Sequence, residues 1–131
     1  MTRREIREHI FLMLFRKDFH EATELTEQME LYIAELETPS LEEYTYLTNR
    51  FQTVVSHLEE IDQTLSEAAS GWKLNRMNKV DLTILRLAVY EMKFDEDVPV
   101  KVAINEAVEM AKTFGGDESP SFVNGVLAKL A

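Results

Sequence analysis

Three arginines stand close together near the start of the chain, at positions 3, 4 and 7. Arg3 and Arg7 are four residues apart, so they share one face of a helix, and Arg4 lies at the edge of that face. Cations are unfavourable in the first turns of a helix, where free N–H groups attract anions. Two interpretations stay open: the arginines bind an external anion, or they form a solvated surface that pairs with Glu5 and Glu8.

Two phenylalanines, Phe114 and Phe122, bracket a short loop that contains Ser119. Aromatic rings beside a helix N-terminus can stack on unpaired bases, and a serine hydroxyl can bond a phosphate or a base edge. Their spacing alone favours the other interpretation, in which both rings are buried core residues. Asn105 and Asn124 lie within apolar helical patterns, and we expect their amides to bond backbone groups rather than a ligand.

The sequence lacks the residue patterns that are typical of an enzyme. It has no Cys, and His9, His20 and His57 lie far apart without a partner at metal-ligand spacing. Gly115-Gly116 lacks the lysine and the strand of a phosphate-binding loop. We therefore expect no catalytic residue, no cofactor and no metal, and the lack of Cys fits a reducing cytoplasm.

The charge of the chain is unevenly distributed. The net charge of −10 argues against a generic nucleic-acid binder. Residues 18–69, however, contain thirteen acids and one base, whereas residues 1–17 contain five bases and two acids. The acidic surface therefore belongs to the middle of the chain, and both ends can still build a local cationic site.

Helical periodicity runs through the whole chain and predicts an all-α fold. Capping signals stand at Thr2, at Ser40 and at Ser119-Pro120, while Pro39 and Ser70-Gly71 interrupt the pattern. The expected helices cover residues 3–17, 25–36, 41–65 (one helix, or two with a bend near residue 57), 80–93, 102–111 and 120–130. No segment approaches the roughly 18 apolar residues that span a membrane. We expect one domain, residues 1–131, of six or seven helices in two packed sub-bundles.

Three motifs in the second half of the chain point to a known family. They read VDxxILRLAVYE from Val80, VPxKVAINEAVEMAK from Val98 and FVNGVL from Phe122. In this order and at this spacing, they closely resemble the NusB family of transcription antitermination factors. The arginine-rich start and the Leu14-Phe15 end of the first helix are also similar to this family, whereas residues 20–70 match only in pattern.

The resemblance implies a function without catalysis. Members of the family bind the boxA sequence of nascent ribosomal RNA, together with the ribosomal protein NusE, and help RNA polymerase to resist termination in the cytoplasm. The expected partners are therefore boxA-type single-stranded RNA, NusE and the RNA polymerase antitermination complex, and no membrane. The alternative is a helical protein-interaction module without RNA binding, related to the NusB-like domain of ribosomal RNA methyltransferases.

The resemblance also implies which residues make these contacts. RNA contacts are expected from the arginine-rich start, from the loop and last helix, and from Arg86, and NusE contacts from a separate set of residues. The expected RNA-binding residues are Arg3, Arg4, Arg7, Arg86, Phe114, Glu118, Ser119 and Phe122, and the expected partner-binding residues are Phe15, Asn75 and Asp81. Position 75 is Asn where the family pattern leads us to expect an acid. Glu118 would repel phosphate unless it accepts a hydrogen bond from a base.

Overall fold

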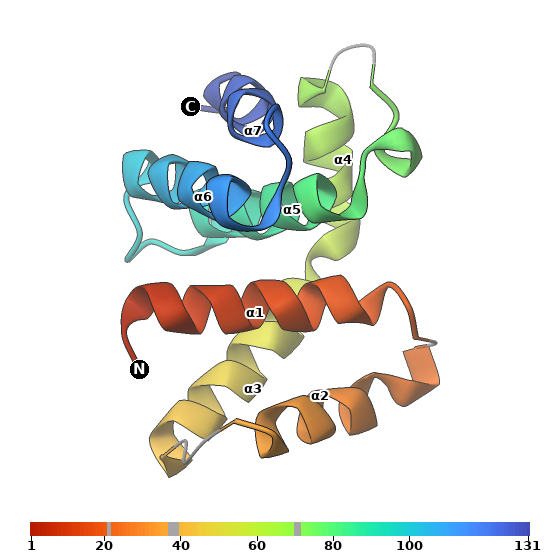
Figure 1. Cartoon of the computed structure of the whole chain (residues 1–131), viewed down its shortest axis with the longest axis vertical. Coiled ribbons are helices and arrows are strands. Elements are labelled where there is room, and N and C mark those ends of the chain that lie inside the picture. Colours follow the sequence, from red (N-terminus) through yellow and green to blue (C-terminus); the bar gives the residue numbers. More distant parts are fainter. Residues whose placement is uncertain (21, 37–39, 70–71) are drawn as a thin grey trace. The chain divides into compact units, whose positions relative to one another are not determined.

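The computed structural model describes residues 1–20, 22–36, 40–69 and 72–131, and these residues form helices without any strand (Figure 1). The elements are α1 (Arg3–Lys17), η1 (Ala22–Glu24), α2 (Leu25–Ala34), α3 (Leu41–Ser56), α4 (Leu58–Ala68), η2 (Leu74–Arg76), α5 (Lys79–Phe94), α6 (Val100–Phe114) and α7 (Ser119–Ala128). The expected all-α fold is therefore confirmed. The described residues fall into two units, unit 1 (Met1–Ser56) and unit 2 (His57–Ala131).

Unit 1 contains α1, α2 and α3, and α1 packs against both of the other helices (Figure 1). The apolar residues that repeat at helical spacing are the ones that are buried. They include Ile10, Phe11, Leu14, Met29, Ile33, Leu47, Phe51 and Val54. Removing each such side chain from water stabilises the fold by about 1.5–3 kcal/mol, so packing rather than intrinsic helix propensity holds these helices.

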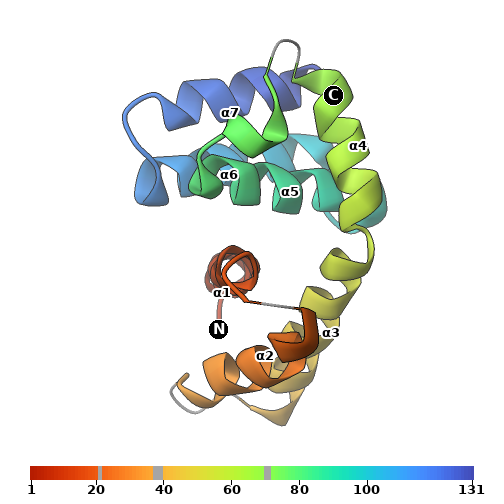
Figure 2. The ribbon, with the colours of Figure 1, turned by 90° about the vertical axis from the view of Figure 1, so that its right-hand side faces the viewer.

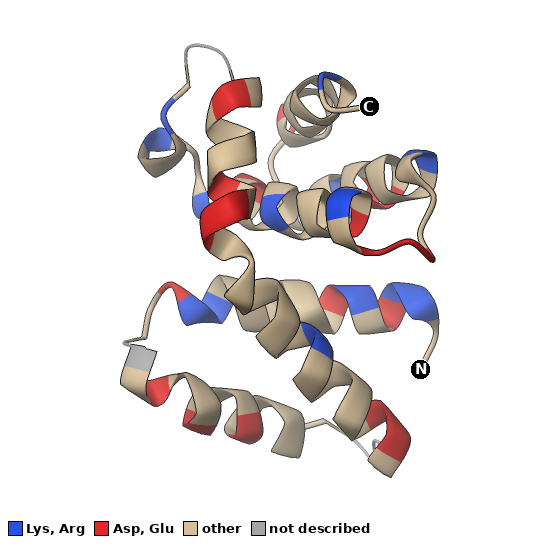
Figure 3. Cartoon of the chain, turned by 180° about the vertical axis from the view of Figure 1, so that it is seen from behind, with Lys and Arg blue, Asp and Glu red and all other residues tan. Residues whose placement is uncertain are grey.

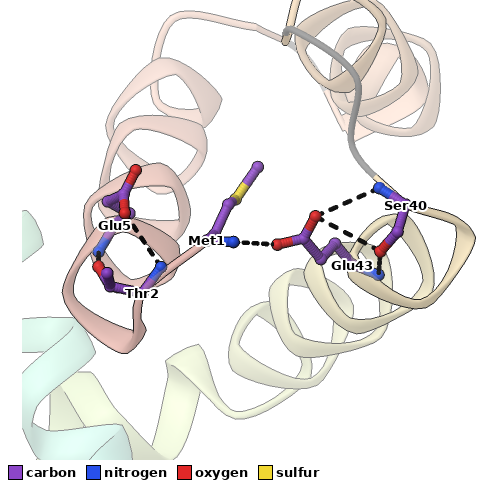
Figure 4. A network of polar contacts seen from close by, with 5 residues as sticks. All are labelled: Met1, Thr2, Glu5, Ser40 and Glu43. Carbon is purple, nitrogen blue, oxygen red and sulfur yellow. Dashed lines mark hydrogen bonds and ion pairs between the residues drawn. The ribbon is translucent and has the colours of Figure 1, made fainter.

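Two capping boxes fix the starts of α1 and α3 (Figure 4). The Glu5 N–H donates to Thr2 Oγ1 (3.1 Å), and the Thr2 N–H donates back to the Glu5 carboxylate (3.0 Å). At α3, the Glu43 N–H donates to Ser40 Oγ (3.0 Å), and the Ser40 N–H donates back to the Glu43 carboxylate (3.2 Å). The Met1 ammonium group donates to the other oxygen of Glu43, so one carboxylate joins the beginnings of both helices.

Unit 2 contains α4 to α7, and α5 is its central helix. Helices α4, α6 and α7 all contact α5, and α6 and α7 also pack closely on each other (Figure 2). As a result, α5 is buried along nearly its whole length from Asp81 to Glu91. This burial fits the nearly continuous apolar run of α5, since a helix that is covered on several sides needs apolar residues around its axis.

The long helical pattern in the middle of the chain forms two helices rather than one. Helix α3 ends at Ser56 and α4 begins at Leu58, so the break falls at His57, where a bend was one of the two expectations. The His57 ring lies 4.2 Å from the Phe94 ring and 6.0 Å from the Tyr90 ring, measured between centroids. Aromatic packing onto α5 therefore holds the first residue of unit 2.

Some sequence-based expectations differ from the structure. Ser119 is the first residue of α7 rather than its cap, and the helix ends at Ala128 rather than near Leu130. Asn105 and Asn124 are exposed, so they are not the buried amides that their apolar neighbours indicated. The expected helix stop at Pro39 and the break at Ser70-Gly71 lie outside the described residues.

Candidate nucleic-acid interface

The arginine face lies in the first two turns of α1 in unit 1. Arg3 and Arg4 are exposed and Arg7 is half-buried, and Figure 3 shows this basic start of the helix in blue. Arg4 and Arg7 also interact with other residues of the chain. A phosphate bound here would therefore have to compete with contacts that these two side chains already make.

The N-terminus of α1 itself is a weaker anion site than the sequence indicated. The capping box already provides an acceptor for the Glu5 N–H, and Glu5 brings a negative charge into the first turn. Hydrogen bonds from the Thr2 backbone and side chain lower the pKa of Glu5, so it remains ionised at neutral pH. Any attraction for RNA at this end must therefore come from the guanidinium groups rather than from free helix N–H groups.

In unit 2, Ser119 organises the loop between α6 and α7. Its side chain is buried, and its Oγ accepts a hydrogen bond from the Gly116 N–H at 3.1 Å. A Cβ atom at position 115 would lie 2.5 Å from Ser119 Oγ and 2.8 Å from the Ala111 carbonyl oxygen. Glycine at 115 is therefore required by this close approach, and the loop is held in one place against α7.

The loop borders a groove with a volume of about 550 Å³. Three expected RNA-binding residues, Glu118, Ser119 and Phe122, line it together with Asp81, which the resemblance implied for the protein partner. The other lining residues are Trp72, Arg76, Met77, Asn78, Gly116 and Asp117. The described residues that line the groove do not include Phe114, which is half-buried at the last residue of α6.

Asp81 has an unusual position on the wall of this groove. It is only 7% exposed, and Asn78, the N-cap of α5, accepts from its N–H (2.8 Å) and donates to its Oδ2 (3.1 Å). The other carboxylate oxygen, Oδ1, is buried and has no hydrogen-bond partner among the described residues. A buried acceptor without a donor is costly, so this oxygen is suited to a donor from a bound molecule.

Arg86 has a structural partner. Its guanidinium donates to both carboxylate oxygens of Asp62, each at 2.9 Å, and so joins α5 to α4. Planar two-point pairs of this kind are among the stronger ion pairs. The expected role of Arg86 in RNA binding therefore has to compete with this pair.

The expected partner-binding residues belong to different units. In unit 1, Phe15 is half-buried, and its ring packs between those of Phe11 (6.2 Å) and Phe19 (5.3 Å). Phe19 is 63% exposed and ends this row of rings, although the sequence analysis did not single it out. In unit 2, Asn75 is exposed in η2. Of these three residues only Asn75 is exposed, because Asp81 is buried and Phe15 is half-buried.

The sequence analysis missed the role of Trp72 in the groove. This residue is 56% exposed, and its ring packs edge-to-face on Phe122, with 5.4 Å between the ring centroids. The sequence feature that could have identified Trp72 is its position as a lone tryptophan in a polar connecting segment. Within the described part of the chain, no cluster of acidic or histidine side chains could hold a metal ion, and no helix is both long and apolar enough to cross a membrane.

Comparisons with known proteins agree with this architecture. The model of the NusB family matches residues 4–131. The transcription antitermination protein NusB of Lachnoclostridium phytofermentans is 62% identical over 99% of the chain and 98% of its own length. The NusB protein of Agathobacter rectalis is 56% identical over the full length of both chains.

Solved structures show the same fold. A T. maritima NusB structure superposes with a TM-score of 0.86 at 32% identity, over 100% of this chain and 91% of its own. A crystal structure of the antitermination factors NusB and NusE in complex with double-stranded RNA gives a TM-score of 0.82 at 28% identity. That match covers 96% of this chain and 92% of the other.

Proposed function

The chain belongs to the NusB family of transcription antitermination factors, and we propose that it binds boxA-type RNA of nascent ribosomal transcripts together with the ribosomal protein NusE. The family is not one of enzymes. We propose that residues 1–131 act as one RNA-binding domain, in the cytoplasm and as part of the RNA polymerase antitermination complex. The observation that carries the proposal is the groove of unit 2, which combines an aromatic wall with hydrogen-bonding groups.

We propose two RNA-contacting regions. In unit 1, the guanidinium groups of the exposed Arg3 and Arg4 and of the half-buried Arg7 contact phosphates, since clustered cations on an acidic chain provide a local site for the RNA backbone. In unit 2, the α6–α7 loop and the start of α7 contact bases, because the Phe122 ring and the Glu118 carboxylate both border the groove. Single-stranded RNA suits this arrangement, since its unstacked bases can enter a groove that a duplex cannot.

The roles of Phe114 and Arg86 in this proposal are smaller. Phe114 is the last residue of α6, next to the loop, so we expect it to act on RNA through the position of the loop. Arg86 holds α5 against α4 through Asp62 at 2.9 Å, and we assign it to that contact.

For NusE, we propose contacts from Phe15, Asn75 and Asp81. The row of rings that includes Phe15 and ends at the exposed Phe19 offers an aromatic anchor, which protein interfaces favour. The unpaired Oδ1 of Asp81 can accept a hydrogen bond from a basic side chain of the partner. A related NusB structure was solved in complex with NusE and double-stranded RNA, which supports NusE as the partner.

Asp81→Asn tests the NusE surface, since it keeps the size of the side chain and removes its charge. We expect weaker NusE binding in a calorimetric titration, with an unchanged helical circular dichroism spectrum. Asn75→Asp is the converse change, because it adds an acid at an exposed position and should strengthen binding to a basic partner. Unaltered affinity in both variants would move the interface away from η2 and the start of α5.

The proposed RNA function is tested by fluorescence anisotropy with a labelled boxA RNA and a scrambled RNA of the same length, each with and without NusE. We expect boxA RNA to bind more tightly than the scrambled RNA, and NusE to increase this difference. Binding of NusE without binding of either RNA would overturn the proposal. That result would support the alternative function, a helical protein-interaction module.

A further inference from the structure

Trp72 is the single tryptophan of the chain, and it borders the groove of unit 2. More than half of its surface is exposed, at 56%, although a large aromatic side chain gains free energy from burial. An exposed, amphipathic ring of this kind beside a groove is typical of a binding surface rather than of a core.

The geometry of the ring pair leaves room for a ligand. Trp72 and Phe122 meet edge-to-face, with 67° between the ring planes. In such a pair, one ring presents its edge to one face of the other, so at least one face of the indole stays uncovered by Phe122. The adjoining groove of about 550 Å³ lies within the range of about 300–1,000 Å³ that is usual for small-molecule sites.

The charges around the groove favour a base over a phosphate inside it. Asp81, Asp117 and Glu118 line the groove and repel phosphate, whereas carboxylates accept hydrogen bonds from exocyclic base amines. Arg76 is exposed and is the one cation among the described lining residues. A nucleotide can therefore place its flat base on the aromatic wall and leave its phosphate outside, near the guanidinium of Arg76.

We propose that Trp72 is an RNA-binding residue that stacks an unpaired base beside Phe122. This inference rests on the proposed function, because it assigns a base-stacking site within the RNA surface of unit 2. A flat aromatic wall favours a flat ligand, and stacking on it tolerates any base because every base has a π-face. The site therefore adds affinity, while the discrimination between bases comes from the carboxylates.

The first test uses the fluorescence of Trp72, which needs no label because the chain has no other tryptophan. Unlabelled boxA-type RNA is titrated into the full chain, and NusE alone is titrated in parallel, with the Trp72→Phe variant providing the background signal. We expect RNA to quench the emission, both in the absence of NusE and beyond any change that NusE alone causes. Quenching by NusE but not by RNA would overturn the proposal and assign the tryptophan to the protein interface.

The second test compares RNA affinities of variants across a range of salt concentrations. Trp72→Ala should weaken binding about ten-fold, since loss of one base stack costs a factor of this order. Trp72→Phe should keep most of the affinity. The slope of log affinity against log salt should stay unchanged in both, because no phosphate contact is lost. Tyr46→Ala is the matched control: it removes a ring that is 45% exposed on α3, outside the proposed sites.

The outcomes separate this inference from the function on which it rests. If the unaltered chain binds RNA and Trp72→Ala binds it equally well, with the same circular dichroism spectrum, the stacking role is wrong while the RNA function stands. A shallower salt slope in Trp72→Ala would also overturn it, because the variant would then have lost an electrostatic contact. If the unaltered chain binds no RNA, with or without NusE, both proposals fail.

Discussion

The hydroxyl of Ser119 shows how one side chain can position a binding loop. It accepts from the Gly116 N–H at 3.1 Å, and it leaves no space for a Cβ atom at position 115. Gly115 has ordinary backbone angles, φ −97° and ψ −175°, so conformational freedom is not the reason for this glycine. The reason is steric. The position of Glu118 and Phe122 at the groove therefore depends on the small size of Gly115, the C-cap of α6.

Gly115→Ala should therefore destabilise the chain. The added methyl group would lie 2.8 Å from the carbonyl oxygen of Ala111, which is backbone and cannot turn away. We expect a loss of about 1–3 kcal/mol in the free energy of unfolding, measured with urea, together with weaker RNA binding. Gly116→Ala is the matched control, since nothing lies within 4 Å of its Cβ position. Equal stability of the two variants would contradict this account of the loop.

Glu118→Gln should separate charge from base reading. Glu118 is exposed at the groove, so its carboxylate repels phosphates but can accept a hydrogen bond from a base. We expect affinity for any RNA to rise about five-fold or less, because exposed charge interactions are worth roughly 0–1 kcal/mol. The preference for boxA over scrambled RNA should fall. Both RNAs are titrated against both proteins, and no change with either would place Glu118 outside the site.

At the scale of elements, the starts of α1 and α3 depend on ionised carboxylates. Hydrogen bonds from the Met1 ammonium group and from the Ser40 backbone lower the pKa of Glu43, and hydrogen bonds from Thr2 lower the pKa of Glu5. A carboxylate whose pKa is lowered by folding stabilises the fold above its ordinary pKa of 4.5. This stabilisation is lost as the pH falls through the lowered pKa.

Glu43→Gln should consequently lower the melting temperature at pH 7, and this difference from the unaltered chain should shrink below pH 4.5. It shrinks because acid protonates the native carboxylate and removes the same interaction. Thermal unfolding followed by circular dichroism at several pH values measures the effect. Glu42→Gln, an acid in the same first turn of α3, controls for the helix dipole. A difference that stays constant with pH would contradict the role of the Glu43 charge.

Elements whose signals are local could be predicted from the sequence. The capping boxes at Thr2 and Ser40 need only four consecutive residues, and both are present. The cap expected at Ser119 is wrong because its hydroxyl accepts from Gly116 in the preceding loop instead. Asn105 and Asn124 had apolar neighbours, but both lie on the exposed side of their helices.

The groove could not be predicted from the sequence, since its walls come from three separate segments. Trp72 precedes η2, Asp81 lies in the first turn of α5, and Phe122 lies in α7. No periodic pattern links these positions, and only the packing of α5, α6 and α7 brings them together. The resemblance to a family gave the roles of Asp81 and Phe122 separately, whereas the structure places both on one groove.

At the scale of the whole molecule, the proposed function requires an acidic chain to bind RNA, which is itself a polyanion. The net charge is −10, and α2 contains Glu27 and Glu30 but no basic residue (Figure 3). Such a chain repels RNA in general, so we expect binding to come from the cations of the arginine face and from base contacts in the groove of unit 2.

The salt dependence of boxA RNA binding tests this central claim most directly. We compare the unaltered chain with Arg3→Ala/Arg4→Ala/Arg7→Ala and with the control Lys93→Ala/Lys101→Ala/Lys129→Ala, which removes the same charge from exposed positions elsewhere. Each phosphate neutralised on a single strand contributes about −0.7 to the slope of log affinity against log salt. We predict that the arginine variant binds more weakly with a slope about two units shallower, and that the lysine variant keeps its slope. Equal slopes and affinities in all three proteins would contradict an arginine face that binds RNA.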